Sequence, residues 1–426
     1  MKLLVLASSL DLQQPFSSTP SWWQLLKGLY EEGVDLVVTT YQGPAIETLW
    51  WRAVPNPVRW QGDLFQAARG MMRRLAGARR PPIPPNQRLG RPSPTGGEGG
   101  ESPQAQGSPS LSMGEGTGVG AESLSDRLVR RVAQTVIAPR WQSYLDRLLR
   151  EQPDIAAVLV LTVPLNHIRG VARFLSDKHG KPVLYYDGDL PASLPAFSGF
   201  ASGFRIYQGA DPGEFTAILG NSVQGLEYVR ALGARETHVF QYAADPEVWS
   251  PLDVPQDVDA FFYGHGREYR EAWIEAMIAA PARALPERRF AVRGTKLGDL
   301  GPTGLLPYLS FSKLREYACR SKLNLVITRR AHTSVYGSST ARPFELAALG
   351  ACMVSSPYEG VGEWFEPERE IVVLSEVGEA TERIRWLLDH DDARRAIGQA
   401  ARGRFLREHT YRHRARQLVG IVSAYL

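Results

Sequence analysis

Short apolar runs, many of them rich in β-branched residues, alternate with amphipathic stretches along most of the chain. In the first half, the runs that predict buried strands cover residues 3–7, 35–40, 155–161, 182–186, 215–220 and 238–242. Helical periodicity covers residues 21–32, 167–178 and 223–232. Apolar strands separated by helices are typical of a parallel sheet covered on both faces. The first half, residues 1–240, is therefore predicted to be a parallel α/β domain.

The same alternation resumes after a proline-containing linker near Asp257. Predicted strands cover residues 259–263, 289–292, 323–328, 351–355 and 371–374. Helical patterns lie between them and continue from about residue 377 to the end of the chain. We therefore expect a second α/β domain over residues 257–408, followed by a terminal helix over residues 409–426.

One segment of the first half lacks this pattern. Residues 78–121 are rich in Pro, Gly, Ser and Glu and contain almost no large apolar side chain. Such a composition cannot bury enough surface to offset the entropy of ordering, so we interpret the segment as a disordered insertion. It is flanked by helical patterns over residues 63–76 and 123–150, which are able to form an antiparallel pair.

Composition narrows the class of protein. The 426 residues are 43% hydrophobic and 22% charged, which is ordinary for a globular protein of two domains. The net charge of +4 is small for this length and does not argue for nucleic acid. No leader-like or membrane-spanning apolar run is present, and the two cysteines, Cys319 and Cys352, are expected to be reduced thiols. We expect a cytoplasmic protein.

The most informative stretch is residues 323–356. It predicts a buried strand, a polar loop, a helix over residues 341–349 closed by Gly350, and a second strand. In doubly wound sheets, ligands bind at the carboxyl ends of the strands. The loop carries Arg329 and Arg330, which suit a diphosphate, although solvated ion pairs are the alternative.

The helix start adds to this prediction. Ser338, Ser339 and Thr340 precede it, and either capping or phosphate binding by the free N–H groups would use them. Arg342 lies in the first turn, where it could contact phosphate or pair with Glu345. Glu345 stands on an otherwise apolar helix, and its carboxylate could accept hydrogen bonds from two vicinal ribose hydroxyls. Together these residues predict a site for a nucleoside diphosphate.

Several motifs extend the match beyond local chemistry. They are ArgProPheGluLeuAlaAlaLeuGly at 342–350, TyrGluGlyValGlyGluTrpPhe at 358–365, GluHisThrTyrArgHisArg at 408–414, AlaLeuGlyAla at 231–234 and AlaAlaAspProGluValTrpSerPro at 243–251. With these motifs the chain resembles glycosyltransferases of the GT-B architecture (group 1 families), and within them the bacterial spore-maturation CgeB-type transferases. The resemblance covers residues 206–426 well. It implies two facing Rossmann-like domains, with a C-terminal helix that crosses back to the first. Many relatives carry two glutamates eight residues apart, whereas here Gly337 occupies the earlier position.

Two further loops are candidates for donor binding. His265 and Arg267 follow the first strand of the second domain, where two glycines allow close approach of a ligand. The loop after the strand at 351–355 places Tyr358, Gly360, Val361 and Gly362 at the same edge of the sheet. Both loops have a purely structural alternative, because glycine turns after strands are common.

In the first half, the catalytic candidates are Asp187, Asp189 and His167. Each follows a predicted strand, and a carboxylate there could act as general base or orient an acceptor. An AspGlyAsp turn and a histidine near a helix start are equally ordinary structural features. The resemblance implies that helix dipoles and basic side chains, not a metal ion, stabilise the leaving diphosphate.

The sequence thus predicts a metal-independent glycosyltransferase that moves a sugar from a nucleoside-diphosphate sugar to the hydroxyl of a glycan or small molecule. No cofactor is expected beyond the nucleotide sugar as co-substrate. A nucleotide-sugar 2-epimerase on the same architecture and a non-catalytic scaffold are the alternatives. The basic face of residues 63–80 has two interpretations, a solvated surface or a weak peripheral contact with anionic lipid.

Overall fold

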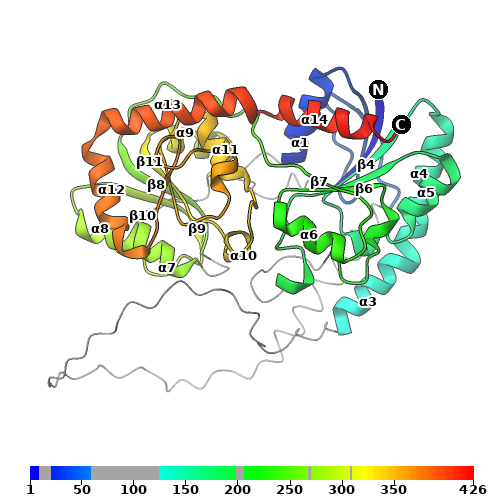
Figure 1. The fold of residues 1–426 in the computed structure, drawn as a ribbon, viewed down its shortest axis with the longest axis horizontal. Coiled ribbons are helices and arrows are strands. Elements are labelled where there is room, and N and C mark those ends of the chain that lie inside the picture. Colours follow the sequence, from blue (N-terminus) through cyan, green and yellow to red (C-terminus); the bar gives the residue numbers. More distant parts are fainter. Residues whose placement is uncertain (9–20, 59–123, 198–205, 267–269, 308) are drawn as a thin grey trace. The chain divides into compact units, whose positions relative to one another are not determined.

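The computed structural model describes residues 1–8, 21–58, 124–197, 206–266, 270–307 and 309–426 (Figure 1). The predicted insertion at 78–121, the predicted helix at 63–76, the basic face at 63–80 and Arg267 lie outside the described residues. Residues 1–59 and 122–426 belong to one compact unit.

The described first half contains a seven-stranded sheet in which each strand is parallel to its neighbours. Its order is β3-β2-β1-β4-β5-β6-β7, so the chain first runs outward from β1 and then returns to its other side. The strands are β1 (Lys2–Ala7), β2 (Asp35–Thr40), β3 (Arg52–Ala53), β4 (Ala157–Leu161), β5 (Val183–Asp187), β6 (Ala217–Gly220) and β7 (Thr237–Val239).

Helices cover both faces of this sheet. They are α1 (Ser21–Glu31), α3 (Leu124–Val132), α4 (Ala138–Glu151), α5 (Val171–His179) and α6 (Val223–Ala231), with a π-helical segment, Ala133–Ile137, joining α3 to α4. Residues of β1 alternate between two cores: Leu4 and Leu6 pack with α4 and α5, whereas Leu3 and Val5 pack with α1. The alternation follows from the period of two in a strand.

The second half has a similar architecture. In the described residues, a six-stranded parallel sheet has the order β10-β9-β8-β11-β12-β13. Its strands are β8 (Val258–His265), β9 (Phe290–Thr295), β10 (Gly304–Leu305), β11 (Ser321–Val326), β12 (Met353–Ser355) and β13 (Val372–Val373). The chain reverses its direction of winding at β8, which lies between β9 and β11. This crevice is where doubly wound sheets bind ligands.

The helices of the second half are α7 (Glu271–Ile274), a π-helical segment (Glu275–Ala279), α8 (Ala280–Ala284), α9 (Phe311–Cys319), α10 (Arg330–Thr333), α11 (Ala341–Ala348), α12 (Ala380–Asp389), α13 (Asp391–Glu408) and α14 (Tyr411–Ser423). Gly350 has a φ of 70° just after α11, as the predicted left-handed cap requires. Cys352 is a buried free thiol, and Cys319 is a half-buried one.

The last helix leaves the second half and packs on the first. Side chains of α14, among them Tyr411, Ala415 and Leu418, belong to the core cluster that also contains Trp22 and Leu25 of α1. Figure 1 shows α14 alongside α1. The predicted crossing of the terminal helix is therefore confirmed.

The predicted strands are all present, with ends that differ by one to three residues in most cases. The short strands β3 and β10 were not predicted, because two residues carry no periodicity. The helix predicted from residue 167 is wrong at its start: a 3-10 helix, Leu165–His167, comes first, and Gly170 with a φ of 86° separates it from α5. None of the described helices is both long and apolar enough to cross a membrane.

Candidate functional site

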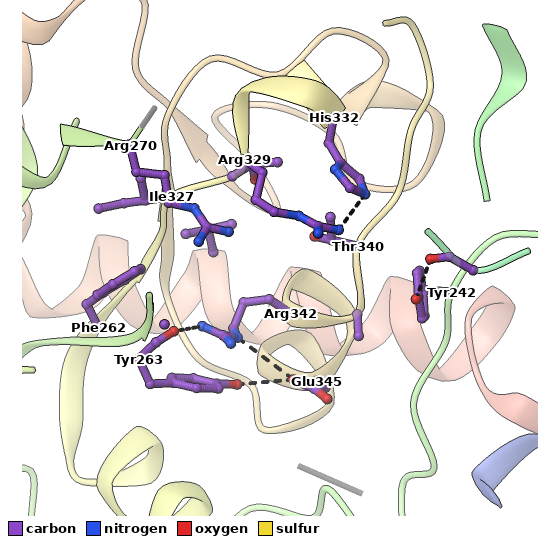
Figure 2. Close-up of a pocket in the computed structure, with 15 residues that line it drawn as sticks. Tyr242, Phe262, Tyr263, Arg270, Ile327, Arg329, His332, Thr340, Arg342 and Glu345 are labelled. Carbon is purple, nitrogen blue, oxygen red and sulfur yellow. Dashed lines mark hydrogen bonds and ion pairs between the residues drawn. The ribbon is translucent and has the colours of Figure 1, made fainter. Parts of the chain in front are cut away.

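A cavity of about 230 Å³ opens at the carboxyl ends of β8 and β11, in the crevice where the second sheet reverses its winding (Figure 2). Most of its lining comes from three segments of the second half: the end of β8, the loop after β11 and the first turns of α11. Gly188 and Tyr242 of the first half complete it. The lining residues are Gly188, Tyr242, Phe262, Tyr263, Gly264, Arg270, Val326, Ile327, Thr328, Arg329, His332, Thr340, Ala341, Arg342 and Glu345.

Three arginines from different elements line this cavity. Arg270 immediately precedes α7, Arg329 immediately precedes α10, and Arg342 lies in the first turn of α11. Figure 2 shows their side chains converging on the same space. A guanidinium group keeps its charge at any relevant pH and matches the oxygens of a phosphate group. The lining therefore favours an anion that carries more than one charge.

Backbone contacts position two of these guanidinium groups. Arg270 donates to the carbonyl oxygen of His265 at 2.7 Å, and Arg342 donates to the carbonyl oxygen of Tyr263. Arg342 also lies over the Tyr263 ring, with its guanidinium carbon 3.1 Å from the ring centre. These backbone contacts help to fix both cations at the cavity that they line.

The start of α11 adds backbone donors. Thr340 is the N-cap residue, but its side chain makes no capping hydrogen bond to the helix. Amide groups in the first turn of an α-helix have no intrahelical partner, and Ala341 and Arg342 of this turn line the cavity. Such a helix start attracts anions.

Glu345 supplies the one carboxylate in the described lining. The residue is 4% exposed, and its Oε2 accepts a hydrogen bond of 3.1 Å from the Tyr263 hydroxyl. Burial raises the pKa of this carboxyl, while Arg342 and the Tyr263 hydrogen bond act in the opposite direction. The intrahelical Arg342–Glu345 pair that was weighed against a binding role exists only as a long contact of 3.9 Å between Nε and Oε2.

The two predicted aspartates have different environments. Asp187 is 1% exposed and accepts hydrogen bonds from the Ser193 hydroxyl at 2.5 Å and from the amide of Asp189 at 2.8 Å. Burial raises its pKa to about 6. Its carboxylate therefore shapes the 187–193 turn and does not line the cavity. Asp189 has a 45% exposed side chain and forms an ion pair with Arg329, which lines the cavity.

His332 lies behind Arg329. The residue is 1% exposed, and its Nε2 is 3.1 Å from the same guanidinium nitrogen of Arg329 that donates to Asp189. Burial, together with Arg329 and Arg270, lowers the pKa of His332 well below its usual value. The imidazole is therefore neutral and accepts the hydrogen bond through Nε2, which places its proton on Nδ1.

Ser338 and Ser339, predicted near the phosphates, instead join the two halves. The hydroxyl of Ser338 donates to the carbonyl of Leu190 at 2.8 Å, and the hydroxyl of Ser339 accepts from the amide of Tyr242 at 3.1 Å. The side chain of Asn221, which is fully buried, donates to the carbonyl of Ser339 at 2.7 Å. Neither serine lines the described cavity.

The neighbouring Gly337 explains the missing first glutamate. It has a φ of 62°, and its carbonyl accepts from the amide of Val223 at the start of α6. A Cβ at this position would lie 2.7 Å from a methyl carbon of Val223. A side chain here would be strained and would collide with the first half, so this loop leaves no room for a glutamate.

Other predicted residues lie outside the cavity lining. The ring of His265 contacts the Thr295 hydroxyl at 2.8 Å, and His167 contacts the Tyr41 hydroxyl at 3.2 Å. Tyr358 is buried against Trp364 in the core. Asp187, Asp189, Arg330, Gly360, Val361 and Gly362 are likewise absent from the lining.

Of the predicted site, the structure brings together Arg329, Thr340, Arg342 and Glu345. Residues that were not predicted complete it: Gly188, Tyr242, Tyr263, Arg270 and His332. Arg270 could have been predicted from the sequence, because it closely follows the two glycines and Arg267. His332 lies in the arginine loop. No local pattern predicts that Tyr263 and Tyr242 line the cavity, because their positions depend on the register of distant strands.

Comparison with known proteins agrees with this architecture. Residues 267–420 match the model of a family described as glycosyl transferase-like. No curated protein matches the chain. Among solved structures, sucrose-phosphate synthase from Thermosynechococcus elongatus aligns with a TM-score of 0.62 at 11% identity, covering 99% of this chain and 98% of the other.

Two further structures align over 99% of both chains. They are Anabaena HepE in complex with UDP and glucose (TM-score 0.56, 13% identity) and the trehalose-6-phosphate protein of E. coli bound with UDP-2-fluoro glucose (TM-score 0.55, 12% identity). The chain has the GT-B fold. At these identities the GT-B neighbours establish architecture, and the chemistry has to come from the site.

Proposed function

We propose that the protein is a glycosyltransferase that binds a nucleoside-diphosphate sugar in the cavity between β8, β11 and α11. The observation that carries this proposal is the placement of Glu345 and three arginines around one cavity at the reversal point of the second sheet. The glycosyl transferase-like match over residues 267–420 supports the same reaction class. The finer resemblance to CgeB-type transferases rests on sequence motifs alone.

Each group has a role in this proposal. Arg270, Arg329 and Arg342, with the amides at the start of α11, bind the diphosphate and stabilise the charge that develops on it as it departs. Glu345 accepts hydrogen bonds from the ribose hydroxyls. Asp189, the exposed aspartate of the first half, faces the acceptor hydroxyl. Because three fixed cations already serve the diphosphate, we expect turnover to be equal with and without a chelator.

UDP is the first donor nucleotide to examine, because HepE and the E. coli neighbour were solved with UDP or a UDP sugar. The acceptor, a glycan or a small molecule, and a cytoplasmic location remain parts of the proposal. A nucleotide-sugar 2-epimerase would use the same donor half without an acceptor, and the family match does not favour it. A non-catalytic scaffold would turn over no donor, and Glu345 would be dispensable.

The test is calorimetric titration with UDP, ADP and GDP of the wild type and of Glu345→Gln. In the variant the amide oxygen can still accept from Tyr263, but the second oxygen is replaced by a donor. Affinity should fall by about 1.5–3 kcal/mol, the range for a hydrogen bond to a charged group. Glu382→Gln, an exposed change on α12, is the matched control and should leave affinity unchanged. Equal affinities for wild type and Glu345→Gln would remove the ribose role, and absence of binding by the wild type would remove the proposed function.

A further inference from the structure

The ion pair between Asp189 and Arg329 joins the first half to an arginine that lines the cavity. Arg329 donates to Oδ1 of Asp189 through the same guanidinium nitrogen that donates to His332. The pair is partly solvated, with side-chain exposures of 24% for Arg329 and 45% for Asp189. An ion pair in this setting is weak, because water competes with both charges.

Arg329 is also one of the three cations that line the cavity. Asp189 does not itself line the cavity, but its carboxylate accepts from a guanidinium group that does, and a bound anion would compete for the same group. Arg270 and Arg342, in contrast, make their short contacts to the backbone carbonyls of His265 and Tyr263. Arg329 is paired with a carboxylate of the other half.

His332 keeps Arg329 in place independently of Asp189. Its neutral ring accepts through Nε2 at 3.1 Å and is almost fully buried, so it can hold the guanidinium at the cavity whichever anion is bound. A neutral acceptor does not cancel the charge of Arg329. Asp189 can thus leave without loss of the orientation of the arginine. His332 is a positioning residue in this arrangement.

We propose that the diphosphate of the donor displaces the carboxylate of Asp189 from Arg329, and that the released carboxylate then receives the acceptor hydroxyl. The inference rests on the proposed function and adds an order to it: donor before acceptor. A diphosphate carries more charge than a carboxylate and can contact Arg270, Arg329 and Arg342 together, so it competes well for Arg329.

The transfer step forms one bond to the sugar and breaks another. The acceptor oxygen forms a bond to C1 of the donor sugar, and its proton passes to the carboxylate of Asp189. The bond between C1 and the diphosphate oxygen breaks, and its electron pair leaves on the diphosphate, whose charge the three arginines stabilise. While Oδ1 of Asp189 accepts from Arg329, this oxygen is not available to the acceptor hydroxyl.

The experiment is a double-mutant cycle with Asp189→Asn and Arg329→Gln, read by titration with UDP and with inorganic pyrophosphate. Pyrophosphate has no nucleobase and no ribose, so it tests the diphosphate contact by itself. Asp189→Asn should bind both probes about two- to fivefold more tightly, which corresponds to the strength of a partly exposed pair. Arg329→Gln should bind roughly tenfold or more weakly. In the Arg329→Gln background, Asp189→Asn should have no further effect.

A control distinguishes the displacement of Asp189 from a general effect of removing a negative charge. Asp211→Asn removes another partly exposed, arginine-paired carboxylate of the first half and should leave affinity unchanged. Asp189→Ser repeats the test if the asparagine variant does not fold. Unchanged or weaker binding by Asp189→Asn, or equal tightening in both backgrounds, overturns the proposed displacement. If the wild type binds neither probe, the proposed function fails, and this inference fails with it.

Discussion

At the scale of single residues, the site contains a buried carboxylate whose pKa is raised by burial and lowered by two neighbours. Glu345 is 4% exposed, and burial raises its pKa. Arg342 and the hydroxyl of Tyr263 lower it again, by charge and by a hydrogen bond respectively. In the proposed function, Tyr263 would therefore act on the nucleotide through Glu345, whose ionised form has the acceptors that two ribose hydroxyls need.

Tyr263→Phe should show this dependence. Loss of the hydrogen bond raises the pKa of Glu345 further, and the protonated form loses acceptor capacity. Affinity for the nucleoside diphosphate should be weaker by about 1 kcal/mol near pH 8. As the pH falls, affinity should be lost at a higher pH than in the wild type. Tyr336→Phe, which removes a similar tyrosine–glutamate contact at the surface, is the control for titrations across pH.

At the scale of elements, the junction between α13 and α14 contains a buried histidine that cannot take up a proton easily. Nε2 of His409 donates to the carbonyl of Trp364 at 3.0 Å, and its Nδ1 accepts from Arg414 at 3.1 Å. Burial and the charge of Arg414 lower the pKa of His409 to about 3. The neutral ring is thus part of the turn that directs α14 toward the first half.

The pH dependence of stability follows from this shift. In the unfolded chain a histidine binds a proton near pH 6.5, whereas folded His409 does so only near pH 3. Its contribution to stability is complete above pH 6.5 and is lost as the pH falls from 6.5 toward 3, by up to about 1.4 kcal/mol per pH unit.

Denaturant unfolding of wild type and His409→Gln between pH 7.5 and 5 tests this expectation. The wild type should lose stability more steeply, because the glutamine does not titrate. His390→Gln, a change of an exposed histidine before α13, should keep the wild-type slope. Equal slopes for wild type and His409→Gln would mean that the ring is protonated in the folded protein.

At the scale of the whole molecule, α14 makes the core of the first half depend on the end of the chain. Leu418 of α14 is 1% exposed and packs in the cluster that contains Trp22 and Leu25 of α1. Asn221, Ser338 and Ser339 form a second connection, through buried hydrogen bonds beside the cavity. The two halves are thus joined through α14 and also beside the cavity.

Leu418→Ala should destabilise the protein by about 2–5 kcal/mol, the range for truncation of a buried leucine. Since the helix is shared, unfolding should remain a single transition at the lower midpoint. Ser423→Ala, at the exposed end of α14, should change the free energy of unfolding little. Two separated transitions in Leu418→Ala would show that the halves unfold independently of this contact.

Much of the fold was predictable because it depends on local patterns. The strand at residues 35–40 was predicted at its observed bounds, and Gly350 was predicted as the cap of α11. The same local pattern placed Arg329 and Glu345 at a strand end and on a helix start, and the structure sets both in the cavity. Periodicity and turn chemistry depend on neighbours in the chain, so the sequence alone carries them.

Other features were decided only by tertiary contacts. Asp187 is a structural residue because it contacts Ser193. Asp189 instead contacts Arg329, which is 140 residues away in the chain. Ser338 donates to the carbonyl of Leu190, and Tyr263 donates to Glu345, which is 82 residues away in the chain. Sequence pattern determined which edge of each sheet carries chemistry, because strand ends are encoded locally. Which side chains meet there follows from how loops of distant strands pack together, and no local pattern records that packing.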